Sequence, residues 1–139
     1  MAFWLFKTEP GTFSWDDQVK VGRKGEEWSG VRNAVAQKNM RAMKAGDLGF
    51  FYHSVHEKRI VGVVKVVREI HPDSTDATGR WNCVDVEAVG AFPRPVTLAE
   101  IKAEPKLANM ALVKYSRLSV QPVTDEEWAF VCRMGGYKA

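Results

Sequence analysis

The sequence has few of the residues that build disulfide frameworks and metal sites. It contains two cysteines and three histidines in 139 residues. Cys83 and Cys132 lie far apart and form no Cys-x-x-Cys pair, so we expect two buried, small hydrophobic side chains rather than a thiolate zinc site or a disulfide framework. His53 and His56 are three residues apart at a strand exit, where alternation sends them to different faces, and no acidic residue or cysteine completes a recognisable metal set near them. The sequence therefore predicts no metal and no cofactor.

Long hydrophobic runs are also absent. No segment approaches the ~18 apolar residues that a membrane helix needs, and the beginning of the chain lacks an apolar signal segment with a small-residue cleavage site. Hydrophobic residues make up 45% and charged residues 27% of the chain, as in folded soluble domains and unlike disordered ones. We therefore expect a single domain over residues 1–139 that is cytoplasmic and does not contact a membrane.

The chain carries only a small excess of positive charge, with a net charge of +3. Its distribution is uneven: residues 1–70 carry twelve Lys and Arg against eight Asp and Glu, whereas residues 71–139 carry eight against nine. A mildly basic half is compatible with a polyanionic partner. A mixed soluble surface explains the same counts equally well.

Established catalytic motifs are missing as well. There is no Gly-x-Ser-x-Gly elbow, no phosphate-binding glycine loop and no dinucleotide fingerprint. Lys7, Thr8 and Glu9 could act as a catalytic set only if the fold brings their side chains to one point. In isolation, these three residues are better interpreted as a solvated strand end.

Hydrophobic periodicity and capping residues outline the elements that are present. Apolar or alternating segments predict strands at residues 2–7, 48–53, 60–70 and 81–89, with one or two further short strands at 112–120. Capping signals predict helices that begin at Ser14, Asn33, Thr97 and Thr124. The helix that Asn33 caps should carry a basic face, which either meets a nucleic-acid backbone or is merely solvated; its residues are Lys38, Arg41 and Lys44.

The strands at 60–70 and 81–89 give the clearest local signals. Ile60, Val64, Val66 and Ile70 are expected to form one apolar face, and the turn-forming residues 71–80 should be a loop. Ten residues are too few for a helical crossover, so the two strands are predicted to pair antiparallel. The whole pattern favours an α+β fold in which helices pack outside a small mixed barrel.

Trp28 differs from the other tryptophans because it lies on a predicted loop. It follows a glycine-rich and charged stretch at 22–27 and is followed within five residues by Arg32 and Asn33. An indole in this position either stacks on a planar ligand or covers the core, and composition favours neither reading.

Blocks of residues along nearly the whole chain resemble the EVE domain family. Seven or more blocks occur in the family's order, which is far more specific than one motif. They include Trp4-Leu5-Phe6-Lys7-Thr8-Glu9-Pro10, Phe13-Ser14-Trp15-Asp16-Asp17, Trp28-Ser29-Gly30-Val31-Arg32-Asn33, Met40-Arg41-Ala42-Met43, Phe50-Phe51-Tyr52-His53-Ser54, Ile60-Val61-Gly62, Arg80-Trp81, Phe92-Pro93, Arg117-Leu118-Ser119-Val120-Gln121-Pro122-Val123 and Glu127-Trp128.

The resemblance implies a PUA-like small mixed β-barrel of about five to six mainly antiparallel strands with surrounding helices. It also implies non-catalytic binding of DNA or RNA that carries a modified, often methylated, base in an aromatic pocket. Arginine and lysine at such an aromatic cleft should also attract a stray anion. Trp28 and Tyr52 would be the stacking walls of that pocket. The polar partners carried over by position are Lys7, Thr8, Ser14, Asn33, His53, Ser54, Arg117, Ser119 and Gln121.

Two departures from the family pattern and two rival readings accompany the resemblance. Ala34-Val35 stands where relatives often have an aromatic residue, and the loop at 71–80 is shorter than usual and lacks tyrosine. Small amidohydrolases of the same superfamily act on modified nucleosides through Lys, Thr and Glu, the residue types found at 7–9. A scaffold with a vestigial pocket is the third reading.

Overall fold

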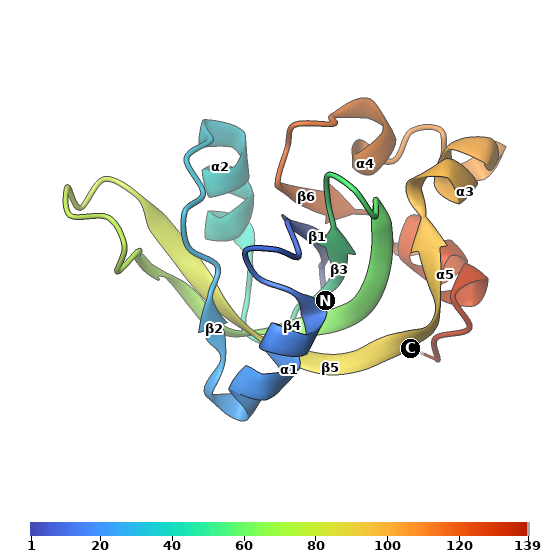
Figure 1. The fold of residues 1–139 in the computed structure, drawn as a ribbon. Helices are drawn as coiled ribbons and strands as arrows, with labels where there is room; N and C mark the ends of the chain where they lie inside the picture. The colour runs from blue at the N-terminus through green and yellow to red at the C-terminus, as the bar shows by residue number, and fades with distance from the viewer. Residues whose placement is uncertain (139) are drawn as a thin grey trace.

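A computed structural model describes residues 1–138 as one six-stranded sheet flanked by helices on both faces (Figure 1). The sheet order is β2-β5-β4-β3-β1-β6. Strands β1 and β3 are parallel, and the other four neighbouring pairs are antiparallel. This confirms the predicted mixed, mainly antiparallel α+β architecture. The strands are β1 (Phe3–Thr8), β2 (Glu26–Glu27), β3 (Leu48–His53), β4 (Arg59–Pro72), β5 (Asn82–Thr97) and β6 (Val120–Val123).

Side-chain caps begin the helices where the sequence predicts them. The hydroxyls of Ser14, Thr97 and Thr124 each accept a hydrogen bond from a backbone N–H three residues on, and an acidic side chain there accepts from the cap's own N–H. The side chain of Asn33 caps the next helix. No helix within residues 1–138 is long and apolar enough to span a membrane. The helices are α1 (Trp15–Val21), α2 (Ala34–Ala42), α3 (Leu98–Ala103), α4 (Ala111–Lys114) and α5 (Asp125–Met134), with 3₁₀ turns at Gly22–Lys24 and Pro105–Leu107.

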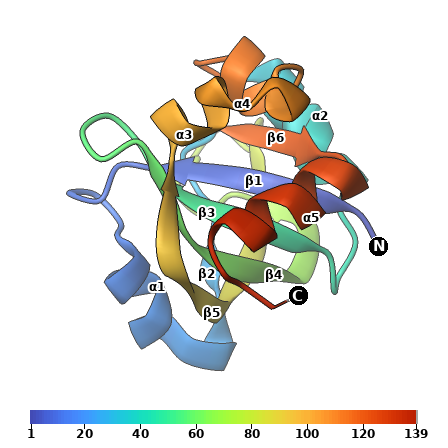
Figure 2. The same cartoon turned by 90° about the vertical axis from the view of Figure 1, so that its right-hand side faces the viewer.

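The central strands bury side chains on both faces of the sheet. Along β3, Phe50 and Tyr52 belong to one apolar cluster, whereas Phe51 between them belongs to the other. We call these the Tyr52 core, covered by α3, α4 and α5, and the Trp28 core, which contains Trp28 and residues of α2. Figure 2 shows α5 lying across the Tyr52 side. Because both faces are buried, β1 and β3 read as continuous apolar runs.

The hairpin of β4 and β5 confirms the predicted antiparallel pairing, but two details of the prediction are wrong. Ile60 lies in the Tyr52 core, whereas Val64, Val66 and Ile70 pack in the Trp28 core. The cause is one extra residue in β4 relative to β3, since Ile60 and Gly62 pair with the adjacent residues Tyr52 and Phe51, and this bulge turns the following side chains to the other face. Strand β4 also extends into the predicted loop, so that the segment at 71–72 belongs to β4 and pairs with β5.

The prediction of strands at 112–120 is wrong. Backbone N–H groups of Val113, Lys114 and Tyr115 donate to carbonyls three or four residues earlier, which forms the short helix α4. This turn places Leu112, 3% exposed, in the Tyr52 core. Burial of that side chain overrides the strand preference of the local sequence, and β6 begins only at Val120.

Candidate functional site

A cavity of about 260 Å³ opens beside Trp28, where the end of β1 meets the loop that follows β2. We call it the Trp28 pocket. Its lining combines two aromatic rings with short polar side chains and two cationic ones. The residues are Lys7, Thr8, Thr12, Phe13, Glu27, Trp28, Ser29, Gly30, Val31, Arg32 and Ser119.

Neighbouring aromatic rings hold Trp28 in place. Its indole meets the rings of Phe6, Phe13 and Phe51 edge-on, with centroid distances of 5.2, 6.2 and 5.6 Å. Its backbone N–H donates to the carbonyl of Val84 at 2.8 Å. Trp28 is 6% exposed and still borders the cavity. It therefore both covers the core and lines the pocket, and its orientation is set before a ligand arrives.

A buried carboxylate, Asp73, fixes the loop that carries the pocket. It accepts hydrogen bonds from the Gly30 N–H at 2.8 Å and from the Arg32 guanidinium at 3.2 Å. Burial alone raises the pKa of Asp73, but hydrogen bonds from Thr75, Gly30 and Arg32 outweigh burial and lower it below its ordinary value. Sequence reasoning missed this residue because the pocket residues that it holds, Gly30 and Arg32, lie more than forty positions away. The local signal is its place in a turn-forming segment.

Lys7 and Thr8 end β1 and project to opposite sides of the sheet. The Thr8 hydroxyl donates to the carbonyl of Phe13 at 2.9 Å, on the Trp28 side. The Lys7 ammonium donates to the carbonyl of Ser116 at 2.9 Å and lies 5.9 Å from the centre of the Tyr52 ring. Partial burial lowers the pKa of Lys7. Lys7 lines cavities on both sides of β1.

The two predicted stacking rings do not share one cavity, so this part of the sequence prediction is corrected. Tyr52 is 3% exposed in the Tyr52 core and borders a separate cavity of about 220 Å³ together with Ser54. Burial raises the pKa of Tyr52 to about 12. The separation follows from strand alternation, because Trp28 packs on Phe51 and the adjacent Tyr52 must point to the other face.

Two predicted polar partners hold the first helix rather than line the pocket. The imidazole Nε2 of His53 accepts a hydrogen bond from the Trp15 N–H at 3.0 Å, and its Nδ1 lies 2.8 Å from the Glu57 carboxylate. These contacts assign the proton to Nδ1. The hydrogen bond with His53 lowers the pKa of Glu57. Ser14 caps the same helix, α1.

Several other predicted residues lie on β6 or around α2, away from the Trp28 pocket. Gln121 is fully buried, and its amide donates to the carbonyls of Tyr115 and Leu118. Asn33 and Arg117 line a cavity of about 670 Å³ between α2 and α4, separate from the Trp28 pocket. The residues Lys38, Arg41 and Lys44 are exposed on and just after α2. Of the predicted ligand-binding residues, the structure gathers Lys7, Thr8, Trp28 and Ser119 at one pocket.

Solved structures provide two close comparisons. The crystal structure of the Agrobacterium tumefaciens protein Atu2648 superposes with a TM-score of 0.96 at 55% identity, covering 99% of this chain and 94% of that one. The crystal structure of human THYN1 in complex with DNA containing 5-methylcytosine superposes with a TM-score of 0.91 at 34% identity, covering all of both chains.

Sequence comparisons agree with the structural ones. Thymocyte nuclear protein 1 of Gallus gallus is 38% identical over 92% of this chain. This chain spans 66% of the length of that relative, so part of the relative lies outside the comparison. The model of the EVE domain matches residues 2–134. On this evidence the chain belongs to the EVE domain family, as its sequence blocks indicated.

Proposed function

We propose that this chain is a non-catalytic module that binds one modified base of a nucleic acid in the Trp28 pocket. The observation that carries the proposal is the cavity itself, in which a fixed indole lies beside hydrogen-bonding groups. Its volume of about 260 Å³ falls just below the ~300–1,000 Å³ of drug-sized ligand sites, which suits a single base. DNA containing 5-methylcytosine is the first ligand to test, because the 34% identical human THYN1 was crystallised with it.

The energetics favour recognition of the base edge together with the modification. Extracting a base from its stack costs a few kcal/mol, and stacking on an aromatic side chain returns about 1–3 kcal/mol. A buried methyl group adds only about 0.8 kcal/mol, roughly a fourfold preference. Hydrogen bonds from the pocket must therefore identify the base. Thr8, Ser29 and Ser119 supply short polar side chains of this kind.

Cationic groups near the pocket are placed to contact the phosphate backbone of the nucleic acid. The Arg32 side chain is 37% exposed and lies at the pocket beside the Trp81 ring, 5.7 Å from its centre. We propose that Arg32 contacts a phosphate flanking the bound base and that it also attracts stray anions. The basic residues of α2 extend this contact. With a net charge of +3, phosphate contacts are few and binding is salt-sensitive.

The amidohydrolase reading is not favoured by the geometry at 7–9. The Lys7 ammonium and the Thr8 hydroxyl donate to carbonyls on opposite sides of β1, and Glu9 is exposed. These three groups therefore do not converge on one reacting atom. Incubation with N-acylated or N-methylated nucleosides tests this directly, since turnover would establish the enzyme. The cytoplasmic location stays a prediction.

The decisive experiment compares oligonucleotides that differ only in the modification. Fluorescence anisotropy with matched DNA carrying cytosine or 5-methylcytosine should show tighter binding to the modified strand, and a panel of modified RNAs tests the other polymer. Tyr52→Leu is the control, because it removes the aromatic ring at the cavity on the opposite side of the sheet and keeps an apolar side chain in the Tyr52 core. Unchanged affinity in this variant supports the Trp28 pocket. Equal affinity for every modified and unmodified ligand would refute base recognition.

A further inference from the structure

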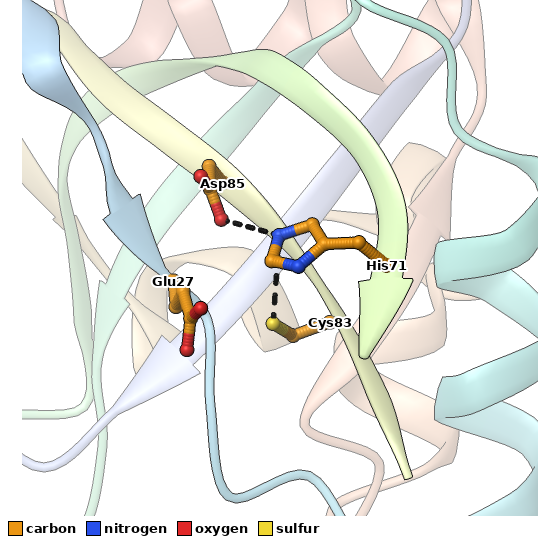
Figure 3. Close-up of side chains that lie close together, drawn as sticks. All are labelled: Glu27, His71, Cys83 and Asp85. Atoms are coloured by element: carbon orange, nitrogen blue, oxygen red, sulfur yellow. Dashed lines mark hydrogen bonds and ion pairs between the residues drawn. The ribbon is translucent and has the colours of Figure 1, made fainter. Parts of the chain in front are cut away.

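Four side chains with metal-binding atoms converge where β2, β5 and β4 lie side by side (Figure 3). Glu27 comes from β2, His71 from the end of β4, and Cys83 and Asp85 from β5. One ligand atom from each lies within 4.8 Å of every other. The strand register explains the convergence, because Glu27 is paired with Asp85 and His71 with Cys83.

The distances are close to those of a tetrahedral zinc site. The His71 Nε2 lies 3.8 Å from the Cys83 sulfur and 2.7 Å from an Asp85 oxygen. Zinc bonds of about 2.3 Å to sulfur and about 2.0–2.2 Å to nitrogen and oxygen place these pairs about 3.6 and 3.4 Å apart. For these two pairs, entry of the ion therefore requires changes of about 0.7 Å or less, and every other pair already lies within 4.8 Å.

Surrounding groups already orient the potential ligands. The His71 Nδ1 lies 3.0 Å from the Pro72 carbonyl, so an N–H there donates to that oxygen, and the Nε2, which donates to the Asp85 carboxylate at 2.7 Å when no ion is bound, faces the cluster. A backbone carbonyl on the second ring nitrogen is the usual support of a metal-bound histidine. The Glu27 carboxylate accepts a hydrogen bond from the Ser74 hydroxyl at 2.6 Å. Both ligands are thus held by partners outside the cluster.

Burial and charge distinguish this set from an ordinary acidic surface group. Cys83 is fully buried, and the side chains of His71 and Asp85 are 9% and 15% exposed. Glu27 and Asp85 are like charges directly opposite each other on paired strands, an arrangement that destabilises a sheet. Among residues 1–138, no Lys or Arg forms an ion pair with either carboxylate. A bound cation removes this repulsion.

We propose that Glu27, His71, Cys83 and Asp85 form a structural Zn²⁺ site that fastens β2 to the β4–β5 hairpin. A thiolate, an imidazole and two carboxylates make a four-coordinate, closed set, which is the form of structural rather than catalytic zinc. Cys83 would bind as the thiolate and His71 through a deprotonated Nε2, and the protons that these two groups give up pass to solvent. Since β2 leads directly into Trp28, the ion also anchors the start of the pocket loop, but the proposal does not rest on base recognition.

Cobalt supplies a spectroscopic test with the full chain. The protein is stripped with a chelator and titrated with Co²⁺. We expect one equivalent to bind and produce the near-ultraviolet charge-transfer band of a cobalt–thiolate bond. Cys83→Ser should abolish the band. Cys132→Ser is the matched control, because Cys132 is also buried but lies on α5 in the Tyr52 core, so this variant should keep the band.

A zinc competition assay adds a test that does not depend on whether Cys83→Ser folds. With a chromophoric chelator as competitor, Glu27→Gln should weaken Zn²⁺ binding at least about tenfold while circular dichroism stays unchanged. Zn²⁺ should also raise the Tm of the wild-type protein in a dose-dependent way. Failure of the wild type to bind one equivalent of Co²⁺ or Zn²⁺, or persistence of the thiolate band in Cys83→Ser, would overturn the proposal.

Discussion

The two sides of the sheet are built from similar aromatic residues but are closed in different ways. On the Tyr52 side, Trp128 of α5 stacks nearly parallel on Phe3 and Phe50, with ring centroids 4.4 and 4.0 Å apart. On the Trp28 side, rings meet edge-on, and a loop tied to Asp73 completes the wall. Three helices, α3, α4 and α5, cover the first side, and two of them carry full capping boxes. We infer that the Tyr52 side mainly supplies stability, whereas the loop-closed side can present polar groups to a ligand.

The largest expected effect concerns the stacked rings of the Tyr52 side. Trp128→Ala should lower the free energy of unfolding by about 3–5 kcal/mol, because it removes a 3% exposed indole that packs between two phenyl rings. Urea denaturation followed by circular dichroism measures the change. The fraction that remains folded should keep its preference among oligonucleotides. A loss below about 1 kcal/mol would contradict the assignment of stability to this side.

Trp28→Ala tests base recognition on the other side of the sheet, and it should also lower stability, because the 6% exposed indole covers the core. We expect affinity for the preferred modified oligonucleotide to fall by about 1–3 kcal/mol, because stacking is lost. The slope of affinity against salt should barely change, since an indole neutralises no phosphate. Anisotropy titrations at two salt concentrations, with folding checked by circular dichroism, measure both quantities. Equal losses for modified and unmodified strands would show that Trp28 does not contact the base.

Asp73→Asn should loosen the loop that carries the pocket. The variant replaces a buried acceptor of several hydrogen bonds, so we expect a loss of about 1–3 kcal/mol in stability at neutral pH and weaker oligonucleotide binding. Because the folded pKa of Asp73 is lowered, its stabilising effect is present above the ordinary aspartate pKa of about 3.9 and is lost as pH falls through the lowered value.

Thermal unfolding at several pH values checks the sign of this effect. The Tm difference between the wild type and Asp73→Asn should be largest near neutral pH and should shrink below about pH 4. A constant difference over the whole range would mean that the ionised carboxylate does not hold the loop.

Local signals made most of the fold predictable. The capping residues Ser14, Thr97 and Thr124 act on backbone groups three residues away, so the sequence alone shows where their helices begin. The parallel pairing of β1 with β3 joins segments about forty-five residues apart and leaves no local pattern. The segment at 112–120 was misassigned because burial of Leu112, rather than local preference, decides its conformation.

The sequence predicts the part of the candidate site that lies within one continuous segment, and it does not predict the parts that come from several strands. The loop around Trp28 is recognisable from its composition and from the family blocks. The assignment of Tyr52 to the same pocket failed because alternation along β3 separates the two rings across the sheet. The cluster of Glu27, His71, Cys83 and Asp85 leaves no sequence signal, because its residues come from three strands with no fixed spacing and the sequence predicts His71 in a loop.

The smallest expected effect tests how far the nucleic-acid contact extends beyond the pocket. Arg41 is exposed on α2 near Lys38 and Lys44, and the question is whether this face meets a phosphate or is merely solvated. If it meets a phosphate, Arg41→Ala should weaken modified and unmodified oligonucleotides equally and reduce the magnitude of the salt slope by about 0.9. Stability should change by less than about 0.5 kcal/mol, because the side chain is on the surface.

Lys102→Ala is the matched control for Arg41→Ala, since it removes the same charge from an exposed position of α3 on the Tyr52 side. Long-range electrostatics alone would make the two variants alike, whereas a direct phosphate contact requires that only Arg41→Ala change the salt slope. Titrations over a range of salt concentrations measure both slopes. An unchanged slope for Arg41→Ala would confine the nucleic-acid contact to the Trp28 pocket and its flanking Arg32.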